Sequence, residues 1–142
     1  MVGVNESEIV CTSWVLAKYL QSIDFKDTCY VIGSAGITHE LDEAGISHVG
    51  VGDTSAQVPD PGKCNYESTI KLDPRVKCVV VGFDYYFNYP KMVAATSYAY
   101  ERPECLFIAT NDDAQFPRSS VTDVVIPGTG TNRRFPTFTL VH

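Results

Sequence analysis

Hydrophobic residues in this chain fall into short blocks, and the spacing within the blocks alternates between a helical and an extended period. The first block, residues 13–23, repeats at helical spacing and predicts a helix, with Thr12 or Ser13 as its N-cap. Four residues are expected on its inward face: Val15, Tyr19, Leu20 and Ile23. The first regular element is therefore expected to be an amphipathic helix.

The later blocks predict strands that alternate with helices. Strands are predicted at 28–32, 47–51, 76–82, 105–109 and 123–126, where apolar and β-branched residues lie between turn-forming residues. Helices are predicted at 37–44, ending at Gly45 as C-cap, and at 90–101, with Pro90 in the first turn and Pro103 beyond the end. The inward candidates of the second of these helices are Val93, Ala94, Tyr98 and Ala99.

The run 76–82 is almost continuously apolar, as is typical of a strand buried on both faces of a parallel sheet. Strands separated by helical stretches favour a mostly parallel sheet with helices on both faces, because right-handed crossovers distribute them that way. The pattern therefore predicts an α/β fold, a small three-layer α/β/α sandwich.

Three segments follow neither period. Residues 52–74 are rich in Gly, Asp, Pro and Ser and predict a long surface loop, and residues 83–89 predict an aromatic-rich loop. Residues 131–142 are expected to be extended, because Pro136 opposes a helix. The expected organisation is one α/β domain at 1–130, followed by a divergent tail at 131–142 that packs on this domain or extends from it.

Composition and charge exclude several classes of function. The 142 residues are 44% hydrophobic and 20% charged, which is typical of a soluble globular domain with one core. A formal net charge of −6 and dispersed basic residues argue against a nucleic-acid partner. No apolar run reaches the roughly 18 residues of a membrane span, and residues 1–8 lack the features of a signal peptide. We expect a cytoplasmic protein without a membrane partner.

Cysteine usage favours free thiols. The five residues are Cys11, Cys29, Cys64, Cys78 and Cys105, an odd number without CxxC spacing, and three of them lie in apolar, strand-like runs. Buried free thiols are therefore expected, and a disulfide or a metal site is the less favoured alternative.

Polar residues follow the predicted strand 105–109 directly. Thr110, Asn111, Asp112 and Asp113 place hydroxyl, amide and carboxylate groups at the carboxyl end of a strand, where open α/β sheets bind ligands. Adjacent carboxylates at a strand end are more often a turn or a substrate contact than a nucleophile with a metal ligand. No catalytic residue is therefore expected on this chain.

Six short motifs occur in a particular order. They are residues 8–13 (Glu-Ile-Val-Cys-Thr-Ser), 30–34 (Tyr-Val-Ile-Gly-Ser), 49–51 (Val-Gly-Val), 79–84 (Val-Val-Val-Gly-Phe-Asp), 109–113 (Ala-Thr-Asn-Asp-Asp) with Pro117, and 127–130 (Pro-Gly-Thr-Gly). This succession resembles the cap domain of haloacid dehalogenase-type phosphatases, in the 4-nitrophenylphosphatase, phosphoglycolate phosphatase and pyridoxal phosphatase group. The resemblance covers about residues 5–130.

The resemblance implies a division of labour. In that family the cap is inserted into a catalytic core, closes over the active site and selects the organic part of a phosphate ester. The core carries the Asp nucleophile of an Asp-x-Asp motif, a Ser or Thr contact, a Lys and the acids that hold Mg²⁺. None of these core motifs can be placed in this sequence, so the resemblance implies a cap that binds no cofactor itself and depends on Mg²⁺ in a core.

The resemblance also assigns a role to the polar residues after strand 105–109. Thr110, Asn111 and Asp113 are expected to contact the leaving group of a substrate or to position the cap over the core. A turn stabilised by its own hydrogen bonds explains the same residues equally well, and both interpretations stay open.

Aromatic residues complete the predicted substrate-binding set. Phe116 lies where family members differ, with His in the pyridoxal-type pattern and an aliphatic residue in the phosphoglycolate-type pattern, and it is expected to shape a pocket wall. Phe83, Asp84 and Tyr85 end the neighbouring strand and are expected to share that wall. Ordinary core packing of Phe116 is the alternative.

Other candidate motifs are weaker. Residues 33–36 and 128–130 are glycine-rich, but the full GxGxxG pattern and a following Lys are absent, so tight turns are expected, the second as a hinge toward the core. His39 and His48 have no Ser or Cys partner at a recognisable spacing and are expected to be structural.

Three hypotheses remain. The chain is a specificity cap that is inert without its core and meets a phosphorylated small molecule only through that core; or it is a truncated form of a full phosphatase; or it is a stand-alone binding module that forms a homodimer. A longer native polypeptide would favour the second hypothesis. The natural substrate is not determined by the sequence.

Overall fold

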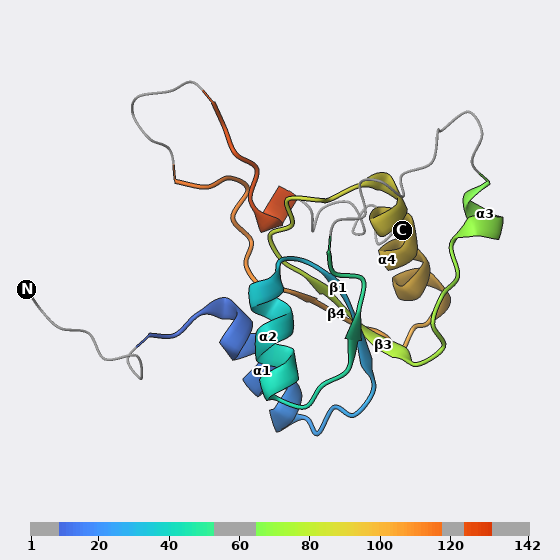
Figure 1. Ribbon diagram of the computed structural model, residues 1–142, viewed down its shortest axis with the longest axis horizontal. Coiled ribbons are helices and arrows are strands. Elements are labelled where there is room, and N and C mark those ends of the chain that lie inside the picture. Colours follow the sequence, from blue (N-terminus) through green and yellow to red (C-terminus); the bar gives the residue numbers. More distant parts are fainter. Residues whose placement is uncertain (1–8, 53–64, 118–123, 132–142) are drawn as a thin grey trace, which may run out of the picture.

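The computed structural model describes residues 9–52, 65–117 and 124–131 of the chain (Figure 1). Helices and strands alternate along most of these ranges. Their bounds are α1 (Thr12–Ser22), β1 (Thr28–Ile32), α2 (Ala35–Glu43), β2 (His48–Val49), α3 (Tyr66–Thr69), β3 (Val76–Val81), α4 (Tyr89–Glu101) and β4 (Leu106–Ala109).

The strands form one parallel sheet in the order β2-β1-β3-β4. The central strands β1 and β3 pair from Thr28, opposite Val76, to Ile32, opposite Val81. Every residue of β1 is buried, and in β3 only Lys77 is not. Burial on both faces explains why these strands are continuous apolar runs, as the sequence predicted for the second of them.

Helices cover the two faces of the sheet, with α1 and α2 on one side and α4 on the other (Figure 1). The core under α1 and α2 consists of Leu16, Leu20, Cys29, Val31, Ile37, Leu41, Ile46, Cys78 and Val80. The core under α4 consists of Tyr30, Ile32, Val76, Val79, Val81, Ala94, Ala95 and Tyr98. The predicted three-layer α/β/α sandwich with a parallel sheet is therefore confirmed.

Helix α1 is rotated relative to the prediction. Its buried residues are Leu16, Ala17 and Leu20, so only Leu20 of the predicted inward face is correct. Val15, Tyr19 and Ile23 are 49%, 48% and 44% exposed and were wrongly assigned to the core. The N-cap is Cys11, one residue before the predicted Thr12 or Ser13.

Several predicted boundaries also change. The strand predicted at 47–51 contains only His48–Val49, and the loop predicted at 52–74 contains the short helix α3. The strand predicted at 123–126 is wrong for residues 124–126, where a single bridge between Gln115 and Pro127 takes its place. Residues 53–64, 118–123 and 132–142, including most of the predicted tail, lie outside the described residues.

The cysteines within the described ranges are free thiols. Cys29 and Cys78 are buried, Cys105 is half-buried, and Cys11 is exposed, so the predicted burial fails at Cys11. A hydrogen bond with Cys29, together with burial, raises the pKa of the Cys78 thiol. Cys64 lies outside the described residues.

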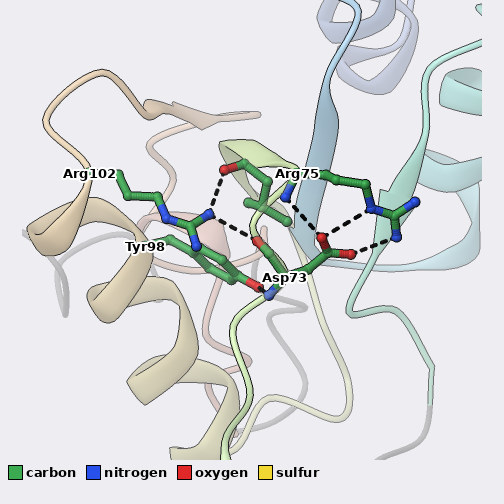
Figure 2. A network of polar contacts seen from close by, with 5 residues as sticks. Asp73, Arg75, Tyr98 and Arg102 are labelled. Atoms are coloured by element: carbon green, nitrogen blue, oxygen red, sulfur yellow. Dashed lines mark hydrogen bonds and ion pairs between the residues drawn. The ribbon is translucent and has the colours of Figure 1, made fainter.

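A polar network anchors the amino end of β3 to the end of α4 (Figure 2). Arg102 donates to the carbonyl oxygens of Asp73 and Val76 at 2.9 and 2.8 Å. Its guanidinium lies 5.0 Å from the ring centre of Tyr98, whose hydroxyl accepts a 2.8 Å hydrogen bond from the Asp73 amide. Arg75 donates to the Asp73 carboxylate and lowers its pKa to about 2.

A buried ion pair holds the opposite end of β3. Lys91 Nζ lies 2.7 Å from Asp84 Oδ2, and the two side chains are only 3% and 2% exposed. Lys91 also donates to the Gly52 carbonyl at 3.2 Å, and Asp84 Oδ1 accepts from the Tyr86 amide at 2.8 Å. The pair therefore joins the segments that follow β2 and β3 to the first turn of α4.

Lys91 was not among the predicted inward residues of the helix at 90–101. It is buried together with Ala94, Ala95 and Tyr98. Ala94 and Tyr98 were predicted to face inward and do so. The other two inward candidates, Val93 and Ala99, are only half-buried.

Lys91→Met is expected to lower the free energy of unfolding by about 3–5 kcal/mol, because the Asp84 carboxylate would be left buried without its partner. Urea unfolding at neutral pH measures this change. The double variant Lys91→Met with Asp84→Leu is expected to recover part of the loss, because it removes both charges.

Lys77→Met is the matched control, since Lys77 forms an ion pair of the same 2.7 Å length with Glu104 but the two side chains are 36% and 59% exposed. Its expected effect is below about 1 kcal/mol. Equal losses at Lys77 and Lys91 would contradict the structural role given to the buried pair.

Candidate functional site

Three strands end side by side at one edge of the sheet. The Gly82 amide donates to the Ile32 carbonyl at 2.7 Å, and the Thr110 amide donates to the Val81 carbonyl at 2.9 Å. The chain connects β1 to β2 on one side, while β3 and β4 lie on the other, so the connections diverge between β1 and β3. This is the place where parallel α/β sheets form their binding crevices.

A cleft of about 240 Å³ lies at this edge. Its walls come from the starts of α1 and α2 and from the segments that follow β3 and β4. The lining residues are Thr12, Ser13, Ser34, Gly36, Ile37, Phe83, Thr110, Asn111, Asp113, Gln115, Phe116, Pro117, Gly128 and Thr129. Five of the seven predicted site residues, Phe83, Thr110, Asn111, Asp113 and Phe116, are therefore brought together.

Aromatic rings form one side of the cleft. The ring centres of Phe83 and Phe116 lie 4.7 Å apart at an interplanar angle of 72°, an edge-to-face contact. The ring centre of Tyr85 lies 4.5 Å from that of Phe83, and Tyr85 is 81% exposed. Phe83 thus joins the segment after β3 to the segment after β4.

The other two predicted site residues lie outside the cleft. Asp84 is enclosed in its ion pair with Lys91, and together with Tyr85 it borders a second hollow that Phe83 also lines. Neither residue lines the first cleft, so a direct substrate contact by Asp84 or Tyr85 stays a prediction.

The polar wall consists mainly of hydroxyls and amides. Asn111 Nδ2 donates to Asp113 Oδ2 at 3.0 Å, so part of the predicted turn is held by its own side chains. The hydrogen-bonded turn is therefore present, and the contact of these residues with a substrate stays a prediction. The Asp113 carboxylate is exposed and its charge faces solvent.

Residues 128–131 close the cleft by pairing with residues 113–116. The Gly128 amide donates to the Ala114 carbonyl at 3.0 Å, and the Gly130 amide donates to the Asp113 carbonyl at 2.9 Å. A Cβ atom on Gly128 would lie 2.4 Å from the Asp113 oxygen, and one on Gly130 would lie 2.3 Å from the Asp112 oxygen. The two glycines are therefore required for a close backbone approach.

Sequence reasoning missed five polar lining residues: Thr12, Ser13, Ser34, Gln115 and Thr129. Thr12 and Ser13 were noted as capping candidates and not as part of a site, and Ser34 was considered only within the glycine-rich turn 33–36. Thr129 was considered only within a glycine-rich turn. Their proximity results from the strand order, which no local pattern reveals.

The described residues hold no cluster of metal-ligating side chains. No three His, Cys, Asp or Glu side chains among them gather around one point. His48 lies beside β1 and contacts Asp42 at 3.0 Å, away from the cleft. Hydrogen bonds from Ser13 and the Trp14 amide lower the pKa of the exposed Cys11 thiol.

Within residues 9–52, 65–117 and 124–131, no helix has both the length and the apolar character needed to cross a bilayer.

Solved structures with the same fold include a p-nitrophenyl phosphatase and a hypothetical protein. The p-nitrophenyl phosphatase from Archaeoglobus fulgidus matches 97% of this chain and 42% of its own, with a TM-score of 0.69 and 23% identity. A hypothetical protein from Pyrococcus horikoshii OT3 matches 99% of this chain and 47% of its own, with a TM-score of 0.70 and 26% identity. The fold is thus that of one part of a p-nitrophenyl phosphatase-like protein.

Curated relatives of the chain include phosphatases that share more of its sequence than these structures do. Phosphoglycolate phosphatase 1A of Arabidopsis thaliana is 47% identical over 119 residues, which are 80% of this chain and 31% of the relative. Glycerol-3-phosphate phosphatase of Gallus gallus is 36% identical over 120 residues, 84% of this chain and 37% of the relative. The predicted resemblance is confirmed, and the chain is a homologue of part of a haloacid dehalogenase-type phosphatase.

The match covers only part of each relative. The chain spans about a third of the length of these curated proteins, at 31% and 37%. No family model matches the chain.

Gly128→Ala and Gly130→Ala are each expected to destabilise the protein by about 1–3 kcal/mol, because the new methyl group would collide with a backbone carbonyl that cannot move independently. Thermal unfolding of the two variants measures the effect.

Gly36→Ala serves as the control, since the nearest atom to a Cβ at that position is Ser34 Oγ at 3.9 Å. It lies within α2 and is expected to stabilise the chain by up to about 1 kcal/mol. A Gly128→Ala variant that unfolds at the same temperature as the unmodified chain would refute the proposed backbone constraint.

Proposed function

We propose that this chain is the substrate-specificity cap of a Mg²⁺-dependent phosphate-monoester phosphatase, and that it is catalytically inert without a core. The homology to phosphatases supports the class of reaction. The geometry of the cleft supports the assignment as an inert cap.

One observation carries the proposal: the first helix and the last described turn meet at the same cleft. Thr12 and Ser13 open α1, Gly128 and Thr129 belong to the last described turn, and all four line the cleft. A domain inserted into another must leave it and return to it on one face. A cleft between these two connections would therefore face the core and any substrate bound there.

The lining residues suit the recognition of the organic part of a phosphate ester. Thr110, Asn111 and Asp113 present hydrogen-bonding groups, while Phe83 and Phe116 present an aromatic wall. Small-molecule sites combine such an apolar wall with a few convergent polar groups. Phe116 is the residue that we expect to influence substrate choice most strongly.

The same lining argues against chemistry on the chain itself. Transfer of a phosphoryl group through an aspartyl intermediate needs a carboxylate nucleophile and a metal ion that neutralises the phosphoryl oxygens. The Asp113 carboxylate accepts a hydrogen bond from Asn111, and the described residues offer no set of metal ligands around it. The proposal therefore assigns Mg²⁺ and the nucleophile to a core.

The purified 142-residue chain is expected to release no phosphate above buffer from 4-nitrophenyl phosphate or phosphoglycolate, with Mg²⁺ or with EDTA. As a matched positive control, residues 9–131 replace the corresponding segment of Arabidopsis phosphoglycolate phosphatase 1A. This chimaera is expected to release phosphate in a manner that EDTA abolishes, because the core of the relative supplies the nucleophile and the metal site.

EDTA-sensitive release by the 142-residue chain alone, abolished by Asp112→Asn or Asp113→Asn, would show that the catalytic centre has been misplaced. A folded chimaera without activity would count against the role of this domain as a cap.

A second candidate function, self-association as a binding module, is supported by the outer face of α1. Trp14, Val15, Tyr19 and Ile23 are 42–49% exposed and extend along one side of the helix. An apolar stripe of this kind on a surface helix is typical of an interface.

If this stripe mediates a homodimer, the mass from sedimentation equilibrium should rise with concentration, and Val15→Ser with Tyr19→Ser should remove the increase. Tyr100→Ser is the control, because Tyr100 is an exposed aromatic on α4, on the opposite face of the sheet. A concentration-independent monomer would exclude this candidate.

A further inference from the structure

The second hollow, which Asp84 and Tyr85 border, has a volume of about 420 Å³. The other side chains that line it are mostly apolar: Phe83, Phe87, Ile126, Pro127 and Thr131. The Asp84 carboxylate is enclosed in its ion pair with Lys91 and offers no free charge to the hollow. An apolar cavity of about 150 Å³ can already hold a benzene ring. The hollow therefore has room for an aromatic side chain.

Much of the apolar surface around this hollow is exposed. Tyr85 is 81% exposed and Ile126 is 53% exposed. The rings of Tyr85 and Phe83 meet at an interplanar angle of 79°, so the aromatic surface is continuous. Exposed apolar side chains that gather around a hollow mark an interaction site, whereas single exposed ones do not. An apolar group from elsewhere is therefore expected to cover this face.

The chain itself continues from the rim of this hollow. Thr131 is half-buried, and it donates from its hydroxyl to the Ala114 carbonyl at 2.8 Å and from its amide to the Gly128 carbonyl at 3.1 Å. Two hydrogen bonds thus fix the point from which residues 132–142 continue. Phe135 follows four residues later and can lie up to about 14 Å from Thr131. The hollow is within that reach, because Thr131 lines it.

Residues 132–142 have the composition that such a hollow requires. This segment contains Phe135, Phe138, Leu140 and Val141. A short covalent connection raises the effective concentration of a segment to the millimolar range. A segment tethered at Thr131 therefore occupies the hollow more readily than a second copy of the chain, which must associate from solution.

Charge complementarity favours the same segment. Arg133 and Arg134 are the first charged residues after Thr131. The Asp113 carboxylate is exposed, and the Asp113 carbonyl accepts from the Gly130 amide at 2.9 Å, so this acidic residue lies beside the point where the segment begins. Exposed ion pairs contribute little to affinity. They favour one direction of the segment here, while burial of apolar side chains provides most of the stabilisation.

We propose that residues 132–142 fold back onto the domain and that the Phe135 side chain occupies this hollow, between Tyr85 and Ile126. The segment then covers the exposed apolar surface and excludes other proteins from this face. This inference goes beyond the proposed function, because it concerns contacts within the free chain and requires no catalytic core.

Photo-crosslinking of the full 142-residue chain tests the proposal. p-Benzoylphenylalanine replaces Phe135, the chain is irradiated in dilute solution, and mass spectrometry identifies the crosslinked peptides. Crosslinks are expected within one chain, to the peptides that contain residues 85–87 or 124–127. A mixture of ¹⁴N- and ¹⁵N-labelled chains separates crosslinks within a chain from crosslinks between two chains.

Ile126→Ser is expected to lower the crosslink yield at residues 85–87 by about fivefold, because part of the apolar wall is lost. Val124→Ser is the matched control, since Val124 is 70% exposed, belongs to the same segment and does not line the hollow. Its crosslink yield should equal that of the unmodified chain. Both side chains are exposed, so both variants are expected to fold.

Crosslinks between labelled and unlabelled chains would overturn the proposal in favour of a second copy as the occupant. Crosslinks to α1, or equal yields for Ile126→Ser and Val124→Ser, would overturn it in favour of docking elsewhere, and absence of crosslinks would refute docking altogether. The chimaera in the phosphate-release assay lacks residues 132–142, so its activity tests the proposed function separately from this inference.

Discussion

The burial of β1 and β3 on both faces is the constraint on which the rest of this structure depends. Two adjacent strands with no exposed face require helices on both sides, and right-handed parallel connections then place every strand end in a fixed position. The Asp73 network secures one end of β3 and the Asp84–Lys91 pair secures the other. The cleft therefore lies at a sheet edge that is anchored on both sides, and packing of the core fixes the positions of its residues.

Two kinds of close approach turn this edge into a cleft. Ring contact between Phe83 and Phe116 links segments that are far apart in the sequence, and the absence of side chains at Gly128 and Gly130 lets two backbones pair closely. A bulkier residue at either glycine would push the last described turn away from Asp113. The glycines thus act through shape, because they allow the close pairing of the two backbones.

Local sequence patterns predicted an element correctly wherever burial and intrinsic propensity favoured the same structure. The strand at 28–32 has the predicted bounds because its β-branched, apolar residues are all buried. The polar residues after β4 were predicted as a site because the carboxyl ends of parallel strands share an edge. The pattern failed where two faces of a helix were equally apolar. Helix α1 has one apolar stripe around Leu20 and another through Tyr19, and only packing selects which of them is buried. The Lys91–Asp84 pair could not be predicted for a similar reason, because the burial of both charges depends on contacts between three segments of the chain.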